Sequence, residues 1–272
     1  MLRGSWGTQK PPVGSVVNWG HPLAQGLVGC WLFNEGAGGY AKNLARVVSG
    51  GTLTNFNYTG ISGWGAGDRG PTLFFDGTND TITVNVAPAL QPATPTYIAR
   101  FRTSSASSQG LICSGTGGTR LYIGVIGAGG TEATSKLSFL IYDGSAFKVV
   151  TSPGTVNDGI WHTAIGTFDG SILRLYLDGI QVNTLSASGS ATYLANNLQI
   201  GSDQSGVDFP FGGPIDYSAI YRRPLTPSET LRIYQNLYAM IQPPAATKFY
   251  SYAASIATGN RRRRILCVGR MM

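Results

Sequence analysis

The chain has 272 residues, of which 42% are hydrophobic and only 12% charged, and it contains 38 glycines. This composition favours many short strands joined by tight turns, and no uninterrupted apolar run reaches the roughly 20 residues of a membrane-spanning helix. The formal charge of +7 falls to +2 without Arg270 and the run Arg261–Arg264, which excludes a uniformly basic, nucleic-acid-binding body. No apolar segment follows Met1–Ser5, so we expect no export signal.

Residues 1–26 show no sustained hydrophobic periodicity. They contain Pro11, Pro12, Pro22 and five glycines. Proline and glycine interrupt regular structure, so this segment is predicted to be an extended N-terminal arm that leads into a domain beginning at Leu27.

Short apolar runs separated by glycine continue from Leu27 to about residue 220. Apolar and polar residues alternate in residues 81–86 and again in 173–177, which is the period of a strand with one buried face. Asp-Gly pairs stand beside five of these runs, and this pair suits the positive φ of hairpin turns. The pattern predicts an antiparallel sheet, with a hairpin centred on Asp178-Gly179.

One segment breaks the strand pattern. Thr226, Pro227 and Glu229 form an N-cap, a first-turn proline and a capping-box glutamate. They predict one helix over about 227–242 that closes a domain of residues 27–242. Residues 243–272 are then a C-terminal arm. The helix would pack through apolar residues at three-to-four spacing: Leu231, Tyr234, Leu237, Tyr238 and Ile241.

Seven short motifs follow one another along the chain. They are Gly26–Gly36 (GLVGCWLFNEG), Leu73–Gly77 (LFFDG) with Asp80, Asp158–His162 (DGIWH), Leu175–Gly179 (LYLDG), Leu198–Gly201 (LQIG), Phe211–Asp216 (FGGPID) and Leu225–Glu229 (LTPSE). Their order resembles LamG-like domains of the concanavalin A-like lectin and glucanase superfamily. The resemblance implies an all-β fold, an antiparallel jelly-roll sandwich with one packed helix.

The resemblance also implies a calcium ion at the edge of the sandwich. It places the ligands at Asn43 and Asp216, although the family usually has an aspartate where this chain has Asn43. Calcium prefers several charged oxygen ligands. The other interpretation of Asp216 is that its carboxylate accepts hydrogen bonds from a turn.

Catalysis is not expected. Hydrolysis of a glycan needs two suitably separated carboxyl groups. The chain has only Glu35, Glu132 and Glu229 as glutamates, in no paired pattern, and Glu229 is assigned to the helix cap. His162 lies in a strand block, where a packed or hydrogen-bonded histidine is expected.

Sugar binding would use aromatic rings in exposed loops. The candidates are Trp64, Tyr58 and Tyr142. A glycan-binding adhesin, with or without calcium, is therefore one hypothesis for the function.

The N-terminal segment favours a different hypothesis. Residues 11–15 (PPVGS) and 19–23 (WGHPL), which lead into GLVGCWLFNEG, resemble the start of LamG-like proteins of tailed bacteriophages. We therefore expect a non-catalytic virion protein, assembled in the host cytoplasm in many copies, that decorates a capsid or belongs to a tail; the alternative location is the cell surface. A third hypothesis is nucleic-acid contact through the arginine run. The residues expected to dock on neighbouring virion subunits are Phe249, Tyr250, Tyr252, Arg261, Arg262, Arg263 and Arg264.

Overall fold

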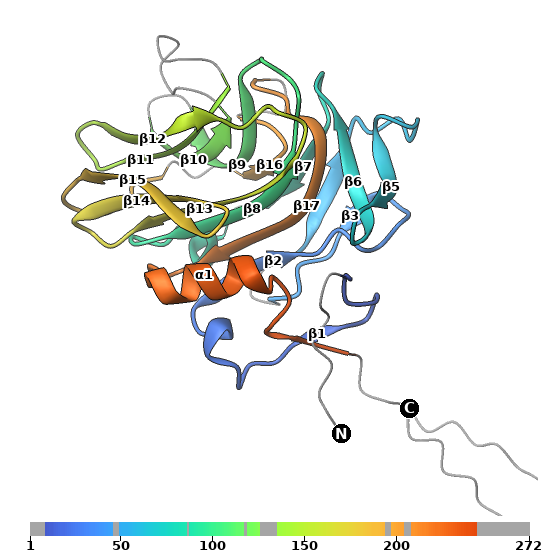
Figure 1. Ribbon diagram of the computed structural model, residues 1–272, viewed down its shortest axis with the longest axis horizontal. Coiled ribbons are helices and arrows are strands. Elements are labelled where there is room, and N and C mark those ends of the chain that lie inside the picture. The colour runs from blue at the N-terminus through green and yellow to red at the C-terminus, as the bar shows by residue number, and fades with distance from the viewer. Residues whose placement is uncertain are drawn as a thin grey trace, which may run out of the picture.

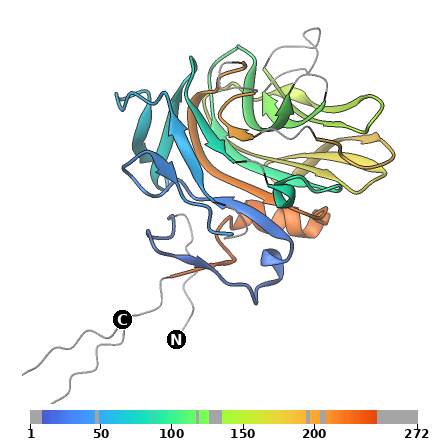
Figure 2. The same ribbon diagram turned by 180° about the vertical axis from the view of Figure 1, so that it is seen from behind.

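The computed structural model describes residues 9–45, 49–85, 87–116, 119–125, 135–193, 197–203 and 208–243. They form two large antiparallel sheets packed face to face, as predicted, with the helix α1 below the second sheet (Figures 1 and 2). The strands β1 and β18 form a third, two-stranded sheet. The first sheet has the order β12-β11-β10-β9-β16-β7-β4-β3. The second has the order β15-β14-β13-β8-β17-β6-β5, and β2 pairs with β17. No helix in the described part of the chain is long and apolar enough to cross a membrane.

The elements follow in chain order. They are β1 Val16–Val17, the short helix η1 Pro22–Ala24, β2 Leu27–Trp31, β3 Tyr40–Ala41, β4 Gly51–Thr54, β5 Gly63–Gly67, β6 Gly70–Asp76, β7 Thr81–Val84, η2 Pro88–Leu90, β8 Thr96–Arg102, β9 Gln109–Thr116, β10 Thr119–Val125, β11 Lys136–Tyr142, β12 Phe147–Thr155, β13 Trp161–Phe168, β14 Ile172–Leu177, β15 Ile180–Ser186, β16 Leu198–Ile200, β17 Gly212–Tyr221, α1 Pro227–Gln235 and β18 Ile241–Gln242.

The predicted hairpin is present between β14 and β15. Leu177 pairs with Ile180, and the two turn residues Asp178 and Gly179 have φ values of 51° and 81°. Glycine adopts this left-handed conformation without steric cost, and aspartate tolerates it better than most residues. The local sequence therefore accounts for this turn.

The central strands of the second sheet are buried on both faces. Its inner face packs against the first sheet through a core that includes Phe75, Phe101 and Leu175. Its outer face packs against α1 and the N-terminal segment through a second apolar cluster that includes Tyr217 and Tyr221. The helix and the N-terminal segment therefore form a third layer on the outer face of the second sheet (Figure 1).

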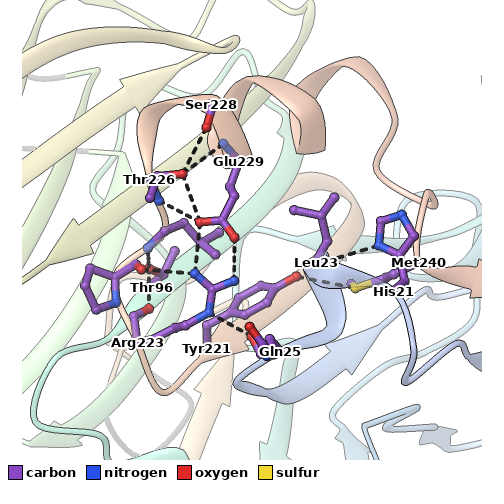
Figure 3. A network of polar contacts seen from close by, with 12 residues as sticks. His21, Leu23, Gln25, Thr96, Tyr221, Arg223, Thr226, Ser228, Glu229 and Met240 are labelled. Atoms are coloured by element: carbon purple, nitrogen blue, oxygen red, sulfur yellow. Dashed lines mark hydrogen bonds and ion pairs between the residues drawn. The ribbon is translucent and has the colours of Figure 1, made fainter.

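This third layer includes residues predicted to form an arm. Residues 9–26 lie on the sandwich: β1 pairs with β18, and Leu23 of η1 is buried in the outer cluster. Figure 3 shows how this segment is attached to the helix: the Arg223 Nε donates to the carbonyl of Gln25, and the Arg223 guanidinium also binds Glu229. The last described residues, around β18, belong to the same layer.

The helix begins as predicted and ends earlier. Thr226 and Glu229 form the capping box, but α1 stops at Gln235, because Asn236 has the non-helical angles φ −150° and ψ 89°. Tyr238 and Ile241 are buried in the outer cluster outside any helix. The three-to-four spacing of apolar residues continues past the helix because an irregular segment and a short strand are also buried there. The spacing alone could not show where the helix ends.

The capping box gives the first prediction. Replacing Thr226 by alanine leaves the amide of Glu229 without its acceptor, and we expect the free energy of unfolding to fall by about 1 kcal/mol in urea denaturation. Gln235→Ala, an exposed change on the same helix, should stay within about 0.5 kcal/mol of wild type. An unchanged Thr226→Ala protein would contradict a stabilising role for the cap.

Candidate functional site

Two of the predicted sugar-binding residues lie together at the edge of the second sheet. Trp64 is on the edge strand β5, and Tyr58 is in the loop between β4 and β5. Both side chains donate to one acceptor, the carbonyl oxygen of Gly38, at 2.7 Å from Trp64 Nε1 and 3.4 Å from the Tyr58 hydroxyl. We call Tyr58, Trp64 and the Gly38 backbone the rim site.

Glycine lets the Tyr58 ring lie close to the edge strand. A Cβ on Gly63 would lie 2.7 Å from the ring of Tyr58, and Gly63 itself has a φ of 103°. A larger residue would therefore displace the ring and strain the backbone. Trp64 is half-buried against the core, whereas Tyr58 is 55% exposed. The site thus presents an exposed aromatic ring beside an anchored one.

The loop that carries Tyr58 is held by its own polar groups. Asn57 Oδ1 accepts from the amide of Thr59 at 3.1 Å, and the amide of Asn57 donates to Ser62 Oγ at 3.0 Å. Such side-chain bonds to the backbone fix a turn without regular structure. These bonds fix the backbone of the turn from which the Tyr58 side chain extends.

Tyr142 is not part of the rim site. It ends β11 and pairs across the hairpin with Phe147 of β12, with ring centroids 5.4 Å apart. β11 and β12 lie at the opposite side of the sandwich from β5 (Figure 1). The structure therefore brings together two of the three predicted aromatic residues and separates the third.

The predicted calcium ligands are engaged by other groups. Asn43 Oδ1 accepts from the amides of Cys30 and Ala45 at 2.9 and 3.0 Å. Asp216 is buried between two cations: its Oδ1 lies 2.5 Å from Lys10 Nζ, and its Oδ2 accepts from Arg100 Nη1. Among the described residues no group of three or more His, Cys, Asp or Glu could hold a metal. A calcium ion does not fit a carboxylate already neutralised on both oxygens.

Glu35 and Glu229 have different surroundings. Glu229 binds Arg223 and the helix cap, and these hydrogen bonds lower its pKa to about 2. Glu35 accepts from the amide of Lys42, and burial raises its pKa above the ordinary value. Glu132 lies outside the described residues. One carboxylate is thus held in a structural ion pair, and the other is in a loop next to the rim site.

His162 is hydrogen-bonded between two carboxylates, in accord with its expected structural role. Its Nδ1 lies 2.7 Å from Asp178 and its Nε2 3.1 Å from Asp158. Asp178 also accepts from the amide of Thr163. The histidine therefore ties the turn after β14 to the loop before β13.

Sequence patterns did not reveal two important residues. Gly38 is one glycine among several in its loop, and its carbonyl becomes an acceptor only when β5 is placed beside it. Lys10 lies in the proline-rich N-terminal segment, and its burial has no counterpart in local hydrophobic periodicity. The predicted docking residues Phe249, Tyr250, Tyr252 and Arg261–Arg264 lie outside the described residues, and so does the predicted contact with nucleic acid.

The fold and the chain sequence place the protein in a family. The model of the concanavalin A-like lectin/glucanases superfamily matches residues 76–230, more than half of the chain. The chain belongs to this family, whose domains are sandwiches of this type. A comparison with curated protein sequences finds no match.

Three solved structures illustrate the similarity of fold. Domain 4 of the arabinanase AbnA from Geobacillus stearothermophilus, solved with arabinotriose, has a TM-score of 0.60 at 16% identity, over 76% of this chain and 98% of that one. The binding domain of Paraclostridial Mosquitocidal Protein 1 has a TM-score of 0.61 at 14% identity, over 80% and 53%. The binding domain of botulinum neurotoxin serotype D has a TM-score of 0.56 at 10% identity, over 79% and 52%.

The geometry of His162 gives the second prediction. The hydrogen bond with Asp178 raises the pKa of His162 above 6.5, so folding favours the protonated ring. This stabilisation is complete below about pH 6.5 and is lost as the pH rises through the folded pKa. Urea denaturation from about pH 6 to about pH 8.5 should show the free-energy difference between wild type and His162→Gln shrinking. A difference independent of pH would contradict the charged pair.

Proposed function

We propose that this protein is a non-catalytic glycan-binding module. The observation that carries the proposal is the rim site, where an exposed tyrosine ring and an anchored tryptophan share the Gly38 carbonyl at a sheet edge. Aromatic faces pack against the C–H face of a sugar, and a hydroxyl on the ring can exchange a weak protein hydrogen bond for one to the sugar. The Tyr58 hydroxyl bond is long, at 3.4 Å, so a sugar hydroxyl can replace it at small cost.

The shape of the site favours weak binding by one copy. Tyr58 is exposed at the edge of the sheet, so a ligand contacts the rim site from one side only and buries little surface. Several linked copies raise the overall affinity because the later binding events become intramolecular. The proposed ligand is therefore a glycan presented in many copies, as on a cell surface.

The related structures support the same function. Domain 4 of AbnA, which matches over nearly its whole length, was solved with arabinotriose, and the two toxin domains are named binding domains. At identities of 16% and below, these relatives support the use of the scaffold for binding and do not identify the sugar. The ion pair of Glu229 with Arg223, which occupies that carboxylate in the helix cap, supports a non-catalytic role.

A second proposal is the virion role expected from the terminal segments. The observation in its favour is that β1 pairs with β18 in a two-stranded sheet of their own, so parts of the N-terminal and C-terminal sequence lie side by side. A partner that contacts this small sheet would touch both parts of the chain at once. Glycan binding and display on a particle are compatible, and the rim site favours glycan binding as the primary function.

The third prediction tests the rim site on a glycan array. Tyr58→Ala removes the exposed ring and should weaken binding about fivefold, because an aromatic contact contributes about 1 kcal/mol. Tyr58→Phe keeps the ring and should retain most of the affinity. Tyr142→Ala is the matched control on the far side of the sandwich and should bind like wild type.

The same array run with a chelator tests the metal. Since Asp216 is already paired with two cations, we expect binding to be unchanged when calcium is removed.

Binding that survives Tyr58→Ala in full, or no binding of the folded wild-type protein to any glycan, would overturn the proposed function.

A further inference from the structure

Lys10 is a buried lysine whose ammonium group donates to three protein oxygen atoms. Its side chain is only 2% exposed. Nζ lies 2.5 Å from Asp216 Oδ1, 2.5 Å from the carbonyl oxygen of Pro71 and 3.1 Å from that of Phe33. An ammonium group has three hydrogens to donate, and here each has an acceptor.

The three oxygens come from three separate parts of the fold. Asp216 is on β17, Pro71 on β6, and Phe33 in the loop after β2. Phe33 has a φ of 48°, a left-handed conformation that costs free energy in a residue other than glycine. The residue with this strained backbone, Phe33, supplies one of the carbonyl oxygens that accept from Lys10. We call these three oxygens the Lys10 cage.

The carboxylate of the cage is fixed from its other side. Arg100 of β8 donates to Asp216 Oδ2 and forms two bonds with Asp68, at 3.1 and 2.8 Å. The ring of Trp161 lies 4.2 Å from the centre of the Arg100 guanidinium. Burial would lower the pKa of Arg100, but the hydrogen bonds and charges of Asp68 and Asp216 raise it. Asp216 therefore accepts from a second cation that is itself held in place.

The alternating charges leave the cluster nearly neutral. Lys10 and Arg100 are balanced by Asp216 and Asp68. Burial lowers the pKa of Lys10, and the charge of Asp216 opposes that shift. Removal of one member of a buried ion pair leaves an uncompensated charge, which destabilises far more than the loss of a surface pair. The cluster therefore needs a cation at the position of Nζ.

We propose that the Lys10 cage is an internal cation-binding site, which the chain fills with its own ammonium group in place of a separate ion. Two carbonyls and a carboxylate surround one positive charge, the arrangement expected of a small-cation site. The lysine stem supplies the cation from the N-terminal segment. This inference goes beyond glycan binding and does not depend on it.

Lys10 in its cage also connects the two segments that carry the rim site, which are the loop of Gly38 and the β5–β6 hairpin. Phe33 begins the loop that carries Gly38, and Pro71 lies on β6, which pairs with the Trp64 strand β5. Gly36 of that loop lies against Pro71. The amide of Lys10 donates to the carbonyl of Arg69, and Asn34 donates to that of Pro11. The N-terminal segment thus holds the loop and the hairpin together.

The fourth prediction concerns loss of the charge. Lys10→Met keeps an unbranched chain without the cation, and we expect the melting temperature to fall by about 10 °C. Amide hydrogen exchange should quicken in residues 36–40 and in β5. The matched control is Lys148→Met, which removes a half-exposed lysine 3.4 Å from Asp143 and should lower the melting temperature by no more than about 3 °C.

Chemical rescue tests the cage as a binding site. Lys10→Ala removes three methylenes and the ammonium group, which together have the size of propylammonium. Propylammonium chloride should raise the melting temperature of this variant by about 5 °C at saturation and should leave wild type unchanged. Tetramethylammonium chloride at equal ionic strength, whose bulky cation has no hydrogen to donate, is the control for salt, and 1-propanol at equal concentration is the control for the apolar stem. An equal effect of calcium chloride would also support a cation site.

A double variant keeps the proposal testable if Lys10→Ala does not fold. Lys10→Met combined with Asp216→Asn removes both charges, so its loss of melting temperature should be smaller than the sum of the two single losses. Additive losses would overturn the charge pairing. Failure of propylammonium and calcium to stabilise a folded Lys10→Ala protein would overturn the cation site, whatever the glycan array shows.

Discussion

The burial of β17 on both faces is the constraint from which the rest of the architecture follows. One face of this strand closes the core between the sheets, and the other needs a separate cover because it carries Tyr217 and Tyr221. The helix α1, β18 and residues 9–26 provide that cover. An outer apolar face of a sheet is stable only when another layer excludes water from it. The N-terminal segment is therefore part of the folded domain.

The same strand explains the buried charges. Asp216 lies between the apolar residues of β17, so its carboxylate must be paired within the protein. Lys10 and Arg100 pair with it from two different directions. The position that the family resemblance assigned to calcium is thus served by a lysine ammonium and a guanidinium.

The rim site depends on an edge strand and on this buried cluster. β5 is rich in glycine and lies at the end of its sheet, so aromatic side chains can pack beside it and remain exposed. Lys10 connects the loop of Gly38 with the hairpin that carries Trp64. Stability and proposed binding are therefore linked through the N-terminal segment, although the two can be tested by separate measurements.

The sequence by itself determined the features that arise from neighbours along the chain. The period-two alternation, the Asp178-Gly179 turn and the Thr226–Glu229 cap are local, so the antiparallel sandwich, its hairpin and the start of its helix could be predicted. Exposed aromatic candidates could also be chosen, and two of three lie at one site. The tertiary structure alone decided the partners of Asp216, the burial of Lys10, the end of α1 and the meeting of Tyr58 and Trp64 at Gly38. These depend on contacts between residues from 20 to more than 200 positions apart, for which local periodicity carries no information.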